Sequence, residues 1–69
     1  MAEKINLRFG RKIREERLKR DISQEELAYR AGVHRTYVGM VERAEKNITL
    51  ANIEKFAKAL KVPIYELFK

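Results

Sequence analysis

A capping box and a glycine confine residues 24–31 to one short helix. Ser23 and Glu26 have the S-x-x-E spacing in which each residue satisfies a backbone N–H of the first helical turn. Gly32 stands where a helix ends in the left-handed conformation, which glycine adopts without Cβ strain. So short a helix is not stable by itself in water. It must pack against neighbouring helices, and this requirement restricts the chain to a small helical domain.

A second short helix is predicted almost immediately after that glycine. His34 is its expected N-cap, and Val33 and Val38 have the spacing of a hydrophobic staple across the cap. The helix is expected to extend from residue 35 to about residue 43. Two short helices joined by a tight glycine-containing turn, here over about residues 24–43, are typical of a DNA-binding helix-turn-helix.

Three further helices are predicted, which makes five in all. One extends from about residue 7 to residue 19, with Asn6 as its N-cap. Another begins after Thr49, where apolar residues recur at helical spacing. Pro63 opens a short last helix, because the missing N–H of proline costs nothing in a first turn. The expected fold is therefore an all-α, five-helix domain over residues 1–69.

Charge and length limit the classes of function. The chain has 16 lysines and arginines against 10 acidic residues, a net charge of +6, which favours a polyanionic partner such as nucleic acid or an anionic membrane. A chain of 69 residues forms one domain and has little room for a deep substrate cavity. The absence of cysteine excludes a disulfide framework and a thiolate metal site.

No arrangement of residues indicates catalysis. The adjacent pairs Glu15-Glu16 and Glu25-Glu26 point in divergent directions on a helix, and the capping role of Ser23 explains that residue. We therefore expect neither an enzyme nor a bound cofactor or metal ion. The start of the sequence lacks the apolar stretch of a signal peptide, and no apolar run approaches the length of a membrane span. We expect a cytoplasmic protein with no membrane partner.

The outward face of the second helix of the motif carries the candidate base-reading residues. The first turn of this helix normally meets base edges in the major groove. Arg35 can donate two hydrogen bonds to guanine O6 and N7, and Thr36 can contact base edges or a thymine methyl. Tyr37 can contact a base or a phosphate, and Met40 adds an apolar contact one turn further on. The alternative is that these are ordinary surface residues.

A second set of residues is expected to hold the DNA backbone. Gln24 begins the first helix of the motif, where the positive end of the helix dipole favours a phosphate. Arg43, Lys46 and Asn47 follow the second helix and can grip the flanking backbone, and His34 is a further candidate at its start. The alternative for the residues after the helix is a solvated polar loop.

Several short segments carry a family resemblance. They are residues 22–28 (ISQEELA), 32–33 (GV), 42–43 (ER) and 57–60 (AKAL). Through these segments the chain, from about residue 7 to residue 68, resembles the phage-repressor family of helix-turn-helix proteins, also called Cro/repressor-like or XRE-type. Within this family, residues 34–38 (HRTYV) and 42–50 (ERAEKNITL) closely resemble the controller proteins of restriction–modification systems.

The resemblance implies a symmetric homodimer bound to the paired half-sites of a palindromic operator in double-stranded DNA. It implies autoregulated transcription and delayed expression of the endonuclease, with RNA polymerase as a further candidate partner. By position, it implies base contacts by Arg35, Thr36 and Tyr37, and an ion pair between Arg17 and Glu42. Two alternatives stay open: an antitoxin or phage-type repressor on the same scaffold, and a protein–protein adaptor that reads no DNA.

Three residues depart from the pattern of the family. Asp21 stands where glycine is common between the first two helices, but Asp tolerates left-handed geometry better than most residues. Glu16 stands where an apolar residue is common, with Leu18 nearby. His34 replaces the commoner Ser or Thr cap. None of these departures removes a proposed DNA contact.

The last third of the chain, about residues 48–69, is the expected dimerisation region. It contains more apolar side chains than one small core obviously needs, namely Leu50, Ile64, Leu67 and Phe68. A two-fold interface is the usual way to cover such a patch. The alternative is that all four residues close the core of a monomer.

Overall fold

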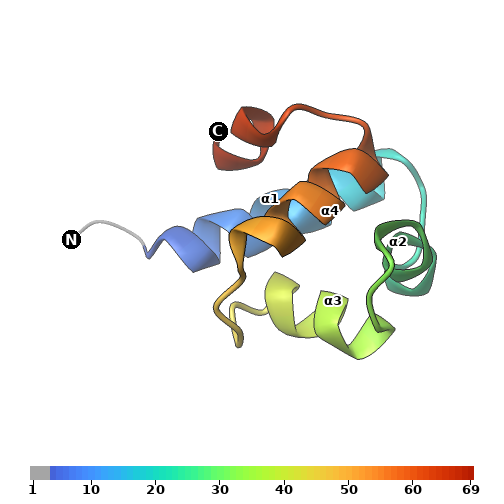
Figure 1. Ribbon diagram of the computed structural model, residues 1–69, viewed down its shortest axis with the longest axis horizontal. Helices are drawn as coiled ribbons and strands as arrows, with labels where there is room; N and C mark the ends of the chain where they lie inside the picture. Colours follow the sequence, from blue (N-terminus) through green and yellow to red (C-terminus); the bar gives the residue numbers. More distant parts are fainter. Residues whose placement is uncertain (1–3) are drawn as a thin grey trace.

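The computed structural model describes residues 4–69, so residues 1–3 of the predicted domain lie outside the described part of the chain. The described residues form four α-helices, one 3-10 helix and no strand. The elements are α1 (Ile5–Lys19), α2 (Gln24–Ala31), α3 (Arg35–Glu42), α4 (Leu50–Leu60) and the 3-10 helix η1 (Ile64–Phe68), shown in Figure 1. None of the described helices is both long and apolar enough to cross a membrane.

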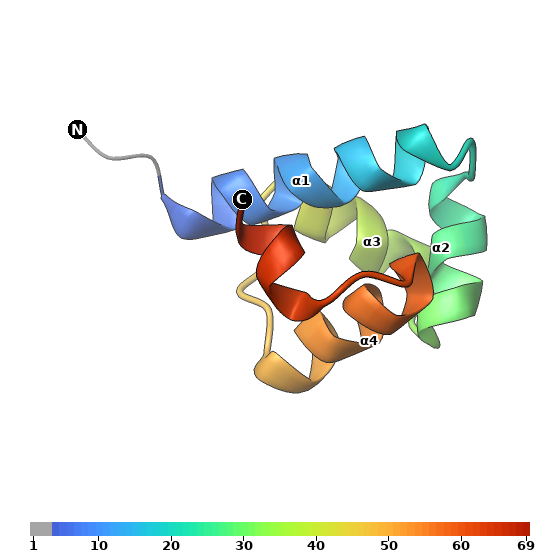
Figure 2. The same ribbon diagram turned by 90° about the horizontal axis from the view of Figure 1, so that it is seen from above.

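The elements surround one core. Figures 1 and 2 show α1 and α4 as two layers, with α3 along one side, η1 along the opposite side, and α2 at the end of the bundle. Every element contributes a side chain to the centre; the largest fully buried ones are Phe9, Ile13, Leu27, Val38, Phe56, Leu60 and Leu67. The shared core fixes α2 against α3, which is the part of the fold that positions the candidate site.

The Ser23 half of the predicted capping box and the Gly32 cap are confirmed, whereas the Glu26 side chain does not accept from the Ser23 N–H. The Ser23 Oγ accepts a hydrogen bond of 3.0 Å from the Glu26 N–H, and Gly32 caps the carboxyl end at a φ of 70°. The Glu26 carboxylate pairs with Arg30 one turn on, at 2.9 Å. Local chemistry therefore determines where this helix begins and ends.

The predicted caps of the next two α-helices are also present. His34 Nδ1 accepts from the Thr36 N–H at 3.1 Å and caps α3. Thr49 Oγ1 accepts from the Asn52 N–H at 3.2 Å and caps α4. A histidine ring nitrogen thus performs the role that the Ser or Thr hydroxyl more often performs.

Two predictions about helices are wrong. The first helix begins at Ile5 rather than Leu7, and Asn6 lies inside it; the residue before the helix, Lys4, makes no side-chain cap. The fifth helix is not an α-helix, because Ile64–Phe68 form a 3-10 helix in which the Glu66 N–H donates to the Pro63 carbonyl. A five-residue segment after Pro63 is too short to gain from α-helical hydrogen bonds.

Glu16 is buried, although sequence reasoning left its role open. Glu16 is only 5% exposed. Its carboxylate lies 2.8 Å from Arg20 Nη1, 3.1 Å from Lys19 Nζ and 3.2 Å from Lys12 Nζ. The hydrogen bond from Arg20, together with those from the two lysines, overcomes the effect of burial and lowers the pKa of Glu16 to about 2. Leu18, in contrast, is 55% exposed and does not replace an apolar residue here.

Gly10 lies where α1 crosses the end of α3. A Cβ on this residue would clash with the Val41 carbonyl and would lie 2.9 Å from the Glu42 carbonyl oxygen. Both neighbours are backbone atoms, so they cannot move aside as a side chain can. The glycine that weakens α1 locally is therefore required by the close approach of the two helices.

We predict that Gly10→Ala destabilises the protein by about 1–3 kcal/mol, because overpacking against backbone outweighs the gain of about 1 kcal/mol in helix propensity. Gly39→Ala is the matched control, since its Cβ meets only side-chain ends, those of Arg43 at 3.0 Å and Gln24 at 3.6 Å. That variant should be neutral or up to about 1 kcal/mol more stable. Urea unfolding followed by circular dichroism, at one fixed protein concentration, measures both; equal effects would contradict the crossing argument.

We predict that Glu16 makes stability dependent on pH. Its pKa is about 2 in the folded protein against an ordinary value of 4.5, so the ionised form stabilises the fold above pH 4.5. This stabilisation, of the order of 3 kcal/mol at most, is lost as the pH falls from 4.5 toward 2. Glu16→Gln should lower stability at pH 7 and flatten the decline in acid. Glu15→Gln, an exposed neighbour on α1, should retain the parental pH profile.

Candidate nucleic-acid interface

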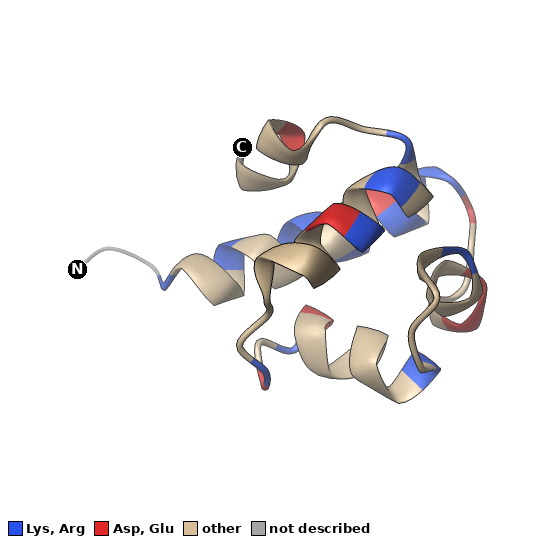
Figure 3. Cartoon of the chain, viewed as in Figure 1, with Lys and Arg blue, Asp and Glu red and all other residues tan. Residues whose placement is uncertain are grey.

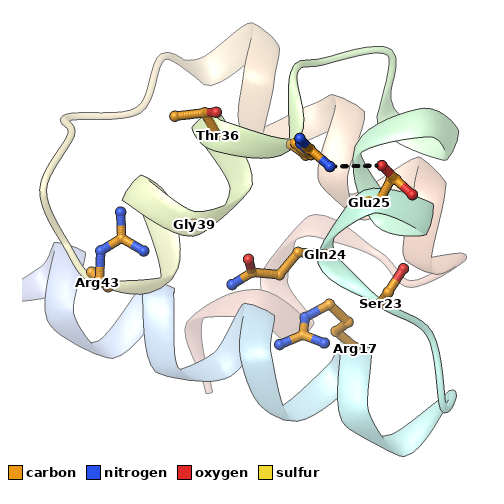
Figure 4. Close-up of a pocket in the computed structure, with 8 residues that line it drawn as sticks. Arg17, Ser23, Gln24, Glu25, Thr36, Gly39 and Arg43 are labelled. Carbon is orange, nitrogen blue, oxygen red and sulfur yellow. Dashed lines mark hydrogen bonds and ion pairs between the residues drawn. The ribbon is translucent and has the colours of Figure 1, made fainter.

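A shallow groove of about 690 Å³ separates the start of α2 from the outer face of α3 (Figure 4). Its walls come from the last turns of α1, the first turn of α2 and the outer side of α3. The lining residues are Arg17, Ser23, Gln24, Glu25, Arg35, Thr36, Gly39 and Arg43. Most of the lining is polar or charged, which suits an ionic ligand better than an apolar one.

The groove face of α3 brings together two of the predicted base-reading residues. Arg35 and Thr36 are exposed in the first turn of the helix and line the groove. Gly39 and Arg43 continue the same face one and two turns further on. Arg35 Nη1 lies 3.0 Å from Glu25 Oε2 across the groove, the contact dashed in Figure 4.

The structure places Tyr37 differently from the sequence prediction. Its side chain is half-buried, and its ring stacks on that of Phe56 with a centroid separation of 6.3 Å. Its hydroxyl accepts a hydrogen bond of 3.0 Å from Asn52 Nδ2 on α4. The expectation that Tyr37 projects outward is therefore wrong, since its ring faces α4. Met40 is half-exposed and does not line the groove.

A buried network of polar side chains holds the groove together. Arg17 forms two hydrogen bonds with the Glu42 carboxylate, Nε to Oε2 at 2.8 Å and Nη2 to Oε1 at 3.1 Å. The two side chains are only 11% and 4% exposed. Gln24 Nε2 donates to the same carboxylate at 3.0 Å, and Arg17 Nη1 donates to the Ile22 carbonyl at 3.0 Å. Glu42 on α3 is thereby tied to α1 and α2 at once.

The other predicted backbone contacts surround this groove. Arg43 is exposed and pairs with Glu45 at 3.1 Å. Lys46 and Asn47 are exposed in the segment between α3 and α4. His34 is exposed, and its Nδ1 is occupied by the cap, so only Nε2 is available to a ligand. Figure 3 shows a basic residue at the start of α3, an acidic residue at its end followed by a basic one, and no charged residue in the middle of that helix.

Sequence reasoning missed two residues of the groove region. Arg14 lines a second depression of about 270 Å³ together with Arg17, Gln24, Glu42 and Arg43. Glu25 was considered only as half of a possible catalytic pair, yet it lies in the groove beside Arg35. Arg14 precedes Arg17 by one helical turn, and this spacing could have placed it on the same side of α1.

The predicted dimer residues divide into exposed and buried ones. Leu50 is 84% exposed and Ile64 is 44% exposed. Leu67 is fully buried in the core of the protomer, so its assignment to a dimer surface is wrong. Phe68 is half-buried and packs on Phe9, with ring centroids 5.3 Å apart. The turn of η1 directs Leu67 inward and leaves Ile64 facing outward.

Comparison with known proteins identifies the family. The helix-turn-helix family profile matches residues 13–67, a span that contains every residue lining the groove. The chain belongs to the helix-turn-helix family. The members of this family are transcription regulators that bind DNA, so α2 and α3 of this helix-turn-helix protein are the two helices of its DNA-binding motif.

Among helix-turn-helix proteins, this chain is similar to restriction–modification controllers. It is 49% identical over 63 residues to the control protein C.BamHI from Bacillus amyloliquefaciens, which is 90% of this chain and 78% of that protein. The crystal structure of the controller C.AhdI from Aeromonas hydrophila matches with a TM-score of 0.89 and 46% identity, covering 91% of this chain and 96% of that one.

A second solved structure has the same fold. The hypothetical transcription factor NHTF from Neisseria matches with a TM-score of 0.92 and 42% identity, covering 100% of this chain and 85% of that one. The three relatives are thus two controller proteins and one hypothetical transcription factor.

We predict that the Arg17–Glu42 pair is strongly coupled. Arg17→Met or Glu42→Leu alone leaves a buried charge without its partner and should cost about 3–5 kcal/mol. The double variant removes both charges and should cost much less than the sum of the two. Denaturant unfolding of the parent, the two single variants and the double variant, at one fixed protein concentration, gives the four free energies of unfolding of this double-mutant cycle. Additive losses would show that the two charges do not interact.

Proposed function

We propose that this chain is a sequence-specific transcription regulator of the restriction–modification controller class, which binds a palindromic operator as a homodimer and regulates its own operon. The observation that carries the proposal is the position of Arg35 and Thr36. Both are exposed in the first turn of α3, and both border a groove whose opposite wall is the start of α2. The similarity to C.BamHI and C.AhdI supports the controller class.

In this proposal the first turn of α3 enters the major groove and reads base edges. Arg35 pairs with Glu25 through Nη1, so its remaining N–H groups can donate to guanine O6 and N7. Thr36 contacts a neighbouring base edge or a thymine methyl. Met40, half-exposed on the flank of α3, adds an apolar contact to the bases beyond.

The surrounding residues hold the sugar–phosphate backbone. Gln24 and the free amides at the start of α2 bind one phosphate, aided by the helix dipole. Arg43, Lys46 and Asn47 bind the strand beyond the end of α3, with His34 Nε2 at the start of α3 and Arg14 beside Gln24. Tyr37 retains its hydroxyl proton after accepting from Asn52, so it can donate that proton to a phosphate oxygen.

The proposed dimer covers the apolar surface of the carboxyl-terminal region. Leu50 and Ile64 are exposed, and Tyr65, which follows Ile64 and which sequence reasoning did not single out, is 64% exposed. Phe68 contributes its exposed edge. A two-fold axis through this region would set the two copies of α3 about 34 Å apart, one turn of DNA. We also propose that the protein acts in the cytoplasm and that RNA polymerase is a further partner.

Selection of bound duplexes from a random pool tests the proposal directly. We expect an enriched site with two-fold symmetry and half-sites one helical turn apart. Analytical ultracentrifugation of the protein with and without the selected duplex should give two protomers per site. Binding that enriches no sequence would leave a non-specific DNA binder or a protein adaptor instead of a regulator.

We predict opposite signatures for Arg35→Ala and Lys46→Ala. Arg35→Ala should relax the preference at one position of each half-site and weaken specific binding by about 1–3 kcal/mol. Lys46→Ala should weaken binding to all sequences and reduce the salt slope, because Lys46 contributes to phosphate binding. Fluorescence anisotropy over a range of salt concentrations measures both. An unaltered preference in Arg35→Ala would show that Arg35 contacts phosphate and not a base.

A further inference from the structure

The arginine placed to read a base is already engaged in the free protein. Glu25 Oε2 lies 3.0 Å from Arg35 Nη1, and the two residues come from different helices, ten positions apart. Both side chains line the groove between α2 and α3 and also the neighbouring depression on the other side of Arg35. Figure 4 shows the Glu25 carboxylate in the groove on the wall opposite Thr36.

This contact does little for the stability of the fold. The Glu25 and Arg35 side chains are 73% and 68% exposed, and ion pairs between such exposed groups contribute little. The pair is unlike the buried Arg17–Glu42 pair, whose side chains are 11% and 4% exposed. The pair therefore affects ligand binding in the groove more than it affects the stability of the fold.

Glu25 is negatively charged, whereas all the other charged residues that line the groove are arginines. Arg35 and Arg43 line the same groove, and every phosphate of an approaching duplex carries a negative charge. A carboxylate in this position repels the backbone of any DNA, whatever its sequence. This cost is offset only where Arg35 gains acceptors that hold its guanidinium in place.

We propose that Glu25 is a specificity-determining residue that acts through Arg35. On a guanine, Arg35 donates to O6 and N7 from its other N–H groups while Nη1 stays on Glu25, because a guanidinium has five donors. The carboxylate then remains paired and fixes the plane of the guanidinium. On other bases the bidentate contact is absent, and Glu25 contributes repulsion without a compensating gain. The inference rests on the proposed function.

Glu26 provides a matched control for Glu25. It lies in the same first turn of α2 and pairs with Arg30 at 2.9 Å, so Glu26→Gln removes the same charge next to an arginine. Neither Glu26 nor Arg30 lines the groove. Any effect of net charge or of the helix dipole should therefore be common to Glu25→Gln and Glu26→Gln, and only the groove contact differs.

The experiment measures dissociation constants for the selected operator and for a scrambled duplex of equal length, at one salt concentration. Glu25→Gln should reduce the ratio of the two constants by about 5–20-fold, since each protomer loses one such pair. Glu26→Gln should change the ratio by less than about twofold. In an Arg35→Ala background, Glu25→Gln should leave the ratio unchanged, because the residue acts through that arginine.

An unchanged ratio in Glu25→Gln, or an equal change in Glu26→Gln, would overturn the inference while leaving the proposed function intact. A parental protein that does not distinguish the two duplexes would instead overturn the proposed function. Circular dichroism of each variant ensures that altered folding does not enter the comparison. Both substitutions are isosteric and lie on exposed side chains, so we expect all variants to fold.

Discussion

One buried carboxylate, that of Glu42, holds the DNA-binding face in position. A buried charge is costly unless it is paired and hydrogen-bonded. Glu42 meets this condition with Arg17 from α1 and Gln24 from α2, at distances between 2.8 and 3.1 Å. Because these partners come from two other helices, the requirement fixes α3 in register against both. The groove therefore keeps its shape without a ligand.

The close approach at Gly10 acts together with this network. Gly10 allows α1 to lie against the carbonyls at the end of α3, close to the residue that carries the buried carboxylate. The inward side of α3, with Val38 and Val41, belongs to the core. The first turn of the same helix, with Arg35 and Thr36, is left exposed. The core residues and the proposed base-reading residues thus lie on opposite faces of one short helix.

Two exposed arginines, one at each end of α3, are each paired with a glutamate. Arg35 pairs with Glu25 and Arg43 pairs with Glu45, at 3.0 and 3.1 Å, and all four side chains are more than half exposed. Exposed pairs of this kind contribute little to stability. The buried Arg17–Glu42 pair links α1 to α3, while the exposed pairs leave both arginines accessible to solvent.

Features that depend on neighbours in the chain could be predicted from the amino-acid sequence. The caps at Ser23 and Thr49 and the two helices of the motif follow from hydrogen bonds spanning three or four residues. Three other features depend on the packing of separate helices: Tyr37 packs on α4, Leu67 is buried, and Glu25 reaches Arg35. Helical spacing fixes which side chains share a face, but what lies opposite that face depends on how separate helices cross.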